Sequence, residues 1–152
     1  MDSAKERAIE LFKQGYNCSQ SVFGAFYKEC GIDFETAIKL SSSFGGGMGR
    51  LREVCGAVSG MFMVAGIVYG YTNPNDKATK TEHYKRIQEL AESFKEKNGS
   101  IVCRELLGLE VKSENYVPED RTTEYYKKRP CAELVGDAAE IIEKYMKNNG
   151  TK

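Results

Sequence analysis

The chain has 152 residues, enough for one domain with a real core, and its 41% hydrophobic and 29% charged residues are typical of globular proteins. That composition excludes an intrinsically disordered chain. Lysine plus arginine and aspartate plus glutamate each number 22, and this balance argues against a general nucleic-acid-binding protein, which would normally be strongly basic.

Capping residues and apolar stripes predict about six helices around a central one. In chain order, helices are expected over residues 4–14, 18–30, 34–40, 51–69, 76–97 and 130–147, with a short helix at 101–107. A flexible glycine loop, GGGMG at residues 45–49, precedes the central helix. The polar segment 108–128 is expected to be a loop with at most a helical turn. The sequence therefore predicts a single all-α domain, a helical bundle over residues 1–152.

The central helix is the most apolar part of the chain. From Val54 to Tyr71 there are eighteen residues without a charged side chain, the lower limit for a transmembrane helix. Small residues are frequent there and no second apolar span follows, so we expect a helix buried on all sides and no membrane span. The charged N-terminus has no apolar signal-peptide core, which favours a cytoplasmic location.

Four of the five cysteines are expected at or near helix starts. Cys18, Cys103 and Cys131 fall in the first turns of predicted helices. Cys55 lies about one turn into the central helix, close to Arg50 and Arg52. Unpaired N–H groups and the helix dipole favour thiolate over thiol at such positions. The thiolate is the form that attacks disulfides and binds metals.

Cys30 is the exception, because it precedes Gly31 at the C-terminal end of a predicted helix. We interpret it as a small packed residue without a functional role. The other four are separated by 37, 48 and 28 residues, so there is no C-x-x-C motif. Any site that they share must be assembled by the fold.

Two glycines beside Cys55 indicate a close contact in the central helix. Gly56 and Gly60 are four residues apart and therefore lie on one helix face, with Ala57 alongside. Small residues at that spacing allow another backbone to approach closely. A thiol beside such a notch is within reach of a second sulfur or of a cofactor, which makes both glycines candidate cofactor-binding residues.

The segments around these cysteines resemble a known family. YNCSQSVF around Cys18, CGAVSG from Cys55, CRELLG from Cys103 and CAELVGDAAEII from Cys131 are together similar to the C_GCAxxG_C_C family of redox-active proteins. The similarity covers nearly the whole chain. It implies that Cys18, Cys55, Cys103 and Cys131 form the functional set and that Cys30 does not belong to it.

Three hypotheses follow for these cysteines. They bind an iron–sulfur cluster or another thiophilic metal for electron transfer, or they cycle as a thiol/disulfide pair. Either chemistry needs a redox partner protein, which the sequence does not name. The alternative is a non-catalytic helical interaction module whose cysteines only pack.

The remaining polar motifs are interpreted without a function. His83 is the only histidine and is expected to be solvated on the polar helix at 76–97, which makes Cys-His catalysis an unfavoured reading. Glu119, Asp120 and Arg121 are expected to be a solvated run of charges. GGGMGR lacks the Lys-Ser/Thr of a P-loop.

Overall fold

The computed structural model describes residues 3–109 and 114–150, and it confirms the predicted all-α fold. The helices are α1 (Ala4–Lys13), α2 (Cys18–Ala25), α3 (Phe34–Ser41), the 3₁₀ helix η1 (Ser42–Phe44), α4 (Gly45–Met48), α5 (Gly56–Tyr69), α6 (Lys77–Asn98), α7 (Cys103–Leu106), α8 (Thr123–Lys128) and α9 (Cys131–Asn149). Within the described ranges there is no β-strand, and a single antiparallel bridge joins Val54 to Val102.

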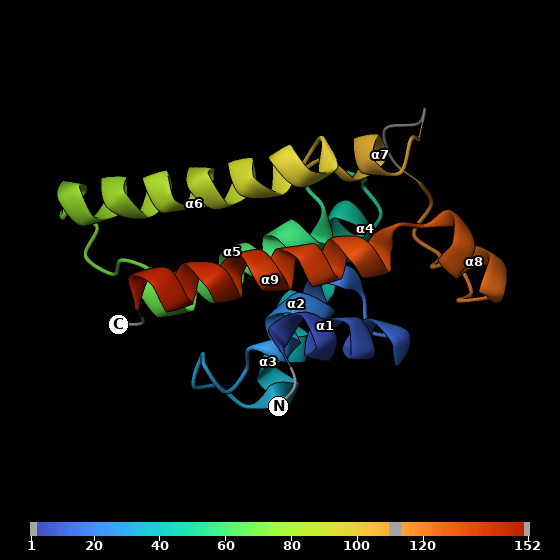
Figure 1. Cartoon of the computed structure of the whole chain (residues 1–152), viewed down its shortest axis with the longest axis horizontal. Coiled ribbons are helices and arrows are strands. Elements are labelled where there is room, and N and C mark those ends of the chain that lie inside the picture. Colours follow the sequence, from blue (N-terminus) through green and yellow to red (C-terminus); the bar gives the residue numbers. More distant parts are fainter. Residues whose placement is uncertain (1–2, 110–113, 151–152) are drawn as a thin grey trace.

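Helix α5 is the buried centre of the bundle, as the sequence predicts. It packs against α2 and α9, while α1 packs against α9 and α2 on the other side. Ten of its fourteen residues are buried. Figure 1 shows α6 running alongside the α5–α9 pair on one side, with α1, α2 and α3 gathered on the other. In the described part of the chain, no helix has the length and hydropathy needed to cross a membrane.

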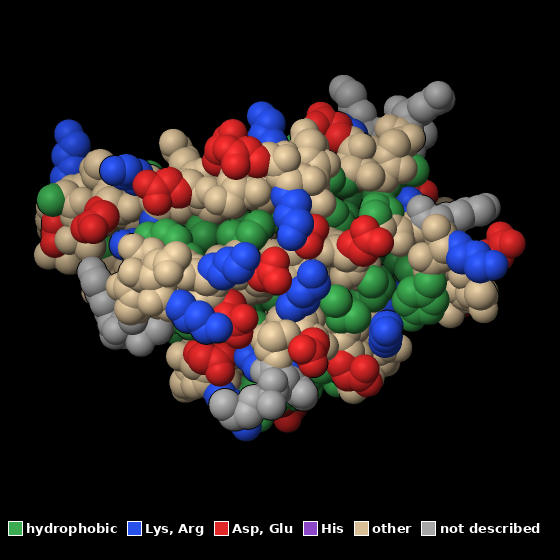
Figure 2. Space-filling view, viewed as in Figure 1, with side chains coloured by type: hydrophobic (Ala, Val, Ile, Leu, Met, Phe, Trp, Pro, Cys, Tyr) green, Lys and Arg blue, Asp and Glu red, His purple; other side chains and the backbone are tan. Residues whose placement is uncertain are grey.

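The predicted caps fix several helix starts. Asn17 and Gln20 form a capping box at the start of α2, with each side chain bonded to the other's backbone N–H. Ser3 caps α1 and Asp33 caps α3 by accepting from the N–H three residues on. Outside the core, acidic and basic side chains alternate over the face formed by α6 and α9 (Figure 2). That mixture is the surface expected of a chain with zero net charge.

The segment before α5 differs from the prediction. The central helix begins at Gly56 and not near Leu51, and Cys55 is its N-cap. Residues 46–50 all have φ between 64° and 71°, so the glycine segment is an ordered left-handed turn instead of a flexible loop. Its carbonyls accept main-chain hydrogen bonds, for example the carbonyl of Gly47 from the N–H of Glu53 at 3.0 Å. A right-handed helix cannot pass through such residues, which explains the later start.

His83 was expected to be solvated, and this is wrong. It is only 8% exposed on α6, with its ring near that of Tyr71 and its Nδ1 3.0 Å from Nη1 of Arg86. Arg86 is itself buried, and its Nε donates to the Tyr145 hydroxyl at 3.0 Å. The reason is that α6 packs on α5 and α9, so its polar face is partly covered.

Candidate functional site

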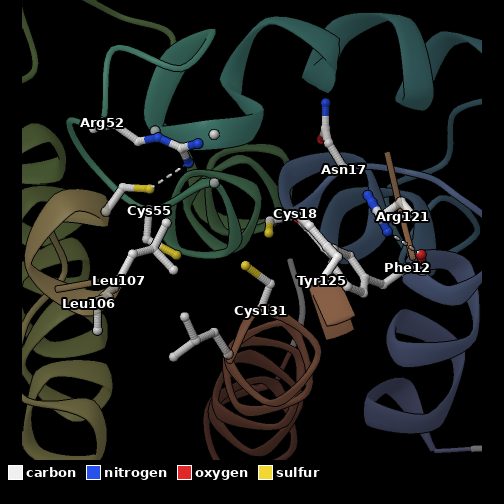
Figure 3. Close-up of a pocket in the computed structure, with 15 residues that line it drawn as sticks. Phe12, Asn17, Cys18, Arg52, Cys55, Leu106, Leu107, Arg121, Tyr125 and Cys131 are labelled. Carbon is white, nitrogen blue, oxygen red and sulfur yellow. Dashed lines mark hydrogen bonds between the residues drawn. The ribbon is translucent and has the colours of Figure 1, made fainter. Parts of the chain in front are cut away.

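The fold brings four cysteines to one cavity. Cys18, Cys55, Cys103 and Cys131 all line a space of about 60 Å³, large enough for several water-sized atoms. Figure 3 shows the labelled Cys18, Cys55 and Cys131 around this space, with Arg52 on its far wall. Cys30 is buried elsewhere in the core and is not among the lining residues. All five cysteines are free thiols.

Each of the four cysteines stands at the start of a helix. Cys18, Cys103 and Cys131 are the first residues of α2, α7 and α9, and Cys55 immediately precedes α5. The prediction placed Cys55 one turn further into its helix; the left-handed turn moves the helix start to it. Four helix starts therefore meet at the cavity, although the cysteines are far apart in sequence.

Glycines allow the surrounding backbones to come this close. A Cβ on Gly60 would lie 2.8 Å from the carbonyl oxygen of Ser19, and one on Gly56 would lie 3.1 Å from the Ser19 nitrogen. A Cβ on Gly47 would lie 2.6 Å from the Cβ of Cys103. The close helix contact predicted at Gly56 and Gly60 exists, and α2 makes it. Gly56 lines the cavity, whereas Gly60 lies outside its lining and serves helix packing.

Cys18 and Cys131 interact, and the interaction shifts the pKa values of the two thiols in opposite directions. The hydrogen bond from Cys18 lowers the pKa of Cys131 to about 7 against the effect of burial, with further help from Arg129 and Tyr125. The same hydrogen bond, together with burial, raises the pKa of Cys18 well above its usual range. The expectation that both thiols are activated by their helix starts is thus wrong for Cys18, because one thiol supplies the proton that stabilises the other as thiolate.

The other two thiols are held mainly as neutral groups. Burial raises the pKa of Cys55 to about 12, although the N–H groups of Val58 and Ala57 partly offset it. Burial also raises the pKa of Cys103, while a hydrogen bond from Arg52 works the other way. Nη1 of Arg52 lies 3.5 Å from the Cys103 sulfur, and its Nη2 lies 2.6 Å from Glu114.

Two cationic residues near the cavity cysteines, Arg121 and Arg129, were not identified from the sequence. Arg121 was assigned to a solvated charge run, but it is half-buried, lines the cavity and donates to the carbonyls of Phe12 and Tyr16, both at 2.7 Å. Arg129 lies close enough to lower the pKa of Cys131. Only the position of Arg129, directly before Pro130 and Cys131, could have indicated from the sequence that it lies near a cysteine.

The thiols do not surround a single point. Across residues 3–109 and 114–150, no three or more His, Cys, Asp or Glu side chains are grouped so that they could hold one metal ion. One tetrahedral zinc or iron ion is therefore not supported by the positions of the four sulfurs. The donor set itself, four cysteines facing one small cavity, is the set that holds iron–sulfur clusters, whose ligands are shared among several iron atoms.

Comparisons with known proteins place the chain in a family. A family model described as "Putative redox-active protein (C_GCAxxG_C_C)" matches residues 16–145, and the chain belongs to this family. A protein of Archaeoglobus fulgidus, described as uncharacterized, is 26% identical over 162 residues, covering 99% of this chain and 97% of the relative. No solved structure matches.

Proposed function

We propose that this protein is an electron-transfer protein whose cavity holds an iron–sulfur cluster on Cys18, Cys55, Cys103 and Cys131. The observation that carries the proposal is that four cysteines from four separate helix starts line one small internal cavity. Four cysteine thiolates are the common ligand set of such clusters. When bound, the cluster would supply one-electron redox chemistry at the cavity.

Burial supports this chemistry over reactions with an external disulfide. Cys55 and Cys103 are buried, and burial raises the pKa of both thiols, so neither is an effective attacking thiolate in the free protein. An exchange reaction requires direct contact between sulfur atoms. Four thiols that line one small cavity instead suit a resident group, whose positive metal ions would stabilise the thiolates.

The charge around the cavity also supports the proposal. A cluster on four thiolates carries net negative charge, and Arg52 and Arg121 both line the cavity. Arg52 already lies within hydrogen-bonding distance of one of the proposed ligands, Cys103. Hydrogen bonds to cluster sulfur atoms are among the features that set a reduction potential.

The test is anaerobic purification followed by reconstitution with iron and sulfide. We expect absorbance between about 320 and 450 nm that bleaches on reduction, together with bound iron and acid-labile sulfide. Replacing any one of the four cysteines with serine should reduce the bound iron, while Cys30→Ser, the matched control, should not. Reconstituted protein that binds no iron, or that binds it equally well in the four variants, would rule the cluster out.

A second candidate is favoured by one observation, the Cys18–Cys131 pair. A thiol whose pKa is lowered to about 7 by a neighbouring thiol is the arrangement of an attacking and a resolving cysteine. Controlled oxidation of metal-free protein followed by peptide mapping distinguishes the two candidates. A reversible Cys18–Cys131 disulfide in a protein that takes up no iron would favour dithiol chemistry.

A further inference from the structure

An arginine-lined groove leads from the surface to the cysteine cavity. It has a volume of about 340 Å³ and shares seven lining residues with the cavity: Asn17, Gly46, Arg52, Leu107, Arg121, Tyr125 and Cys131. Of the four cavity cysteines, Cys131 alone lines both spaces. The groove is therefore continuous with the cavity, and it reaches the redox site at the thiol of lowest pKa.

The walls of the groove carry an excess of positive charge. Four arginines line it, Arg50, Arg52, Arg121 and Arg129, against one glutamate, Glu119. Glu119 lies 2.6 Å from Nη2 of Arg129 and 3.9 Å from Nη1 of Arg50. Glu114 pairs with Arg50 and Arg52 without lining the groove. Two carboxylates thus face four guanidinium groups.

Arg121 accounts for much of this excess. Its guanidinium lies over the Phe12 ring, 4.0 Å from the centroid, and donates to main-chain carbonyls. Neutral carbonyls hold the side chain in place but do not cancel its charge. Within the described residues no carboxylate is paired with Arg121. A fixed cation with neutral partners beside an open groove favours a negatively charged ligand.

We propose that this groove is a binding site for a small anion, one bearing a carboxylate or an oxoanion group, and that it delivers the anion to Cys131. The proposal concerns the groove and does not depend on the cluster. The arginines provide both the charge and the planar donor geometry that carboxylates and oxoanions accept. The volume limits the ligand to a small molecule.

Two alkylating reagents of nearly equal size test the charge selectivity. Iodoacetate is an anion and iodoacetamide is neutral, and each transfers its carbon to a thiolate with loss of iodide. The ratio of their rates at Cys131 is independent of the thiolate fraction, because both reagents need the same thiolate. In metal-free, reduced protein at about 0.1 M ionic strength, we expect this ratio to be about threefold or more above its value in denatured protein.

Charge variants of the groove extend the test in both directions. Arg129→Gln should lower the ratio and Glu119→Gln should raise it, while Cys30 in the same samples should stay unchanged. Lys144→Gln is the matched control, because it also removes one positive charge, from α9, at about 20 Å from Cys131, roughly two Debye lengths away. A native ratio equal to the denatured one, or one unmoved by either groove variant in folded protein, would overturn the proposal.

Sulfate separates a binding site from a general electrostatic field. At matched ionic strength, sulfate should slow the alkylation of Cys131 by the neutral iodoacetamide more than chloride does, since an oxoanion bound in the groove blocks the path to the thiol. The effect should weaken in Arg129→Gln. If sulfate and chloride act equally on iodoacetamide, the groove binds no oxoanion and the proposal fails.

Discussion

Each end of the bundle contains a buried arginine, and the two arginines have different surroundings. Arg52, at the cavity end, is 5% exposed, pairs with Glu114 and contacts the Cys103 sulfur. Arg86, at the far end, is 7% exposed, stacks 4.5 Å above the Tyr69 ring and bonds to Tyr145. Burial of a cation therefore does not by itself mark a functional site. What distinguishes the cavity end is an open space with ionisable thiols around it.

The same contrast applies to the glycines of α5. Gly60, toward the cavity end, is packed against the backbone of α2, whereas a Cβ on Gly66, toward the far end, would meet no atom within 4 Å. It applies again to the thiols, because Cys131 and Cys30 are equally exposed, at 8%, but only Cys131 has partners that stabilise a thiolate. These matched pairs make the comparison testable.

The largest expected effect is in thiol reactivity. At pH 7, in reduced metal-free protein, Cys131 should react with iodoacetamide about a hundred times faster than Cys30. The pKa of Cys131 is lowered to about 7, while burial raises that of Cys30 to about 11. The thiolate fractions of the two residues differ by more than a hundredfold. The more acidic thiol is the weaker nucleophile, however, and this reduces the expected ratio of rates to about a hundred.

Peptide mapping by mass spectrometry gives the two rates separately. The two residues have the same overall exposure, 8%, which makes Cys30 the matched comparison for Cys131. In denaturant the rates should converge. Equal native rates would show that the helix start and the Cys18 hydrogen bond do not activate Cys131.

The next effect is on folding stability at the two glycines. Gly60→Ala should lower the free energy of unfolding by about 1–3 kcal/mol, because the added methyl meets main-chain atoms of α2 that cannot move aside. Gly66→Ala should raise it by up to about 1 kcal/mol through helix propensity. Urea denaturation of both variants measures the contrast, and stabilisation by Gly60→Ala would contradict the close packing.

The dependence of stability on pH should be dominated by the buried neutral thiols. The raised pKa of Cys55, about 12, means that the folded state holds this proton more tightly than the unfolded state. Its contribution is complete below the ordinary value near 9 and falls by about 1.4 kcal/mol per pH unit above it, until the pH reaches about 12. Cys18 and Cys103 act in the same direction.

Cys131 acts in the opposite sense. Its lowered pKa contributes stability that is complete above pH 9 and is lost as the pH falls through about 7.

Because the contribution of Cys55 falls above pH 9, reduced, metal-free protein should lose stability between pH 9 and pH 10. In Cys55→Ala the slope over this interval should be smaller by the contribution of one thiol. An unchanged slope would show that Cys55 does not titrate as proposed.

The smallest expected effects come from lysine replacements of the two buried arginines. Arg86→Lys should cost about 1 kcal/mol of stability, through loss of the stacking on Tyr69, and leave the labelling of Cys103 unchanged. Arg52→Lys should slow the labelling of Cys103 several-fold at pH 8, because the hydrogen bond that lowers its pKa is lost. Equal effects of the two variants on Cys103 would contradict the comparison between the two ends.

The sequence was sufficient for the elements whose causes are local. The Asn17 capping box and the Asp33 cap depend on neighbouring residues, and the structure has both as predicted. The apolar segment likewise indicated a buried helix, although α5 begins at Gly56 and not near Leu51. The membership of Cys18, Cys103 and Cys131 in first helical turns follows from the same signals. Gly56 and Gly60 likewise indicated a close helix contact, which α2 makes.

Only the tertiary structure decided how these pieces combine. The convergence of four thiols depends on the packing of α2, α5 and α9, since the nearest two in sequence are 28 residues apart. The interaction that raises the pKa of Cys18 and lowers that of Cys131 joins residues 113 positions apart. No local rule distinguishes these two helix starts. The places of His83 and Arg121 depend on which surfaces other helices cover. Helix starts and caps are encoded within a few residues of chain, whereas the pKa of a thiol and the charge of a groove are set by groups that folding alone brings within reach.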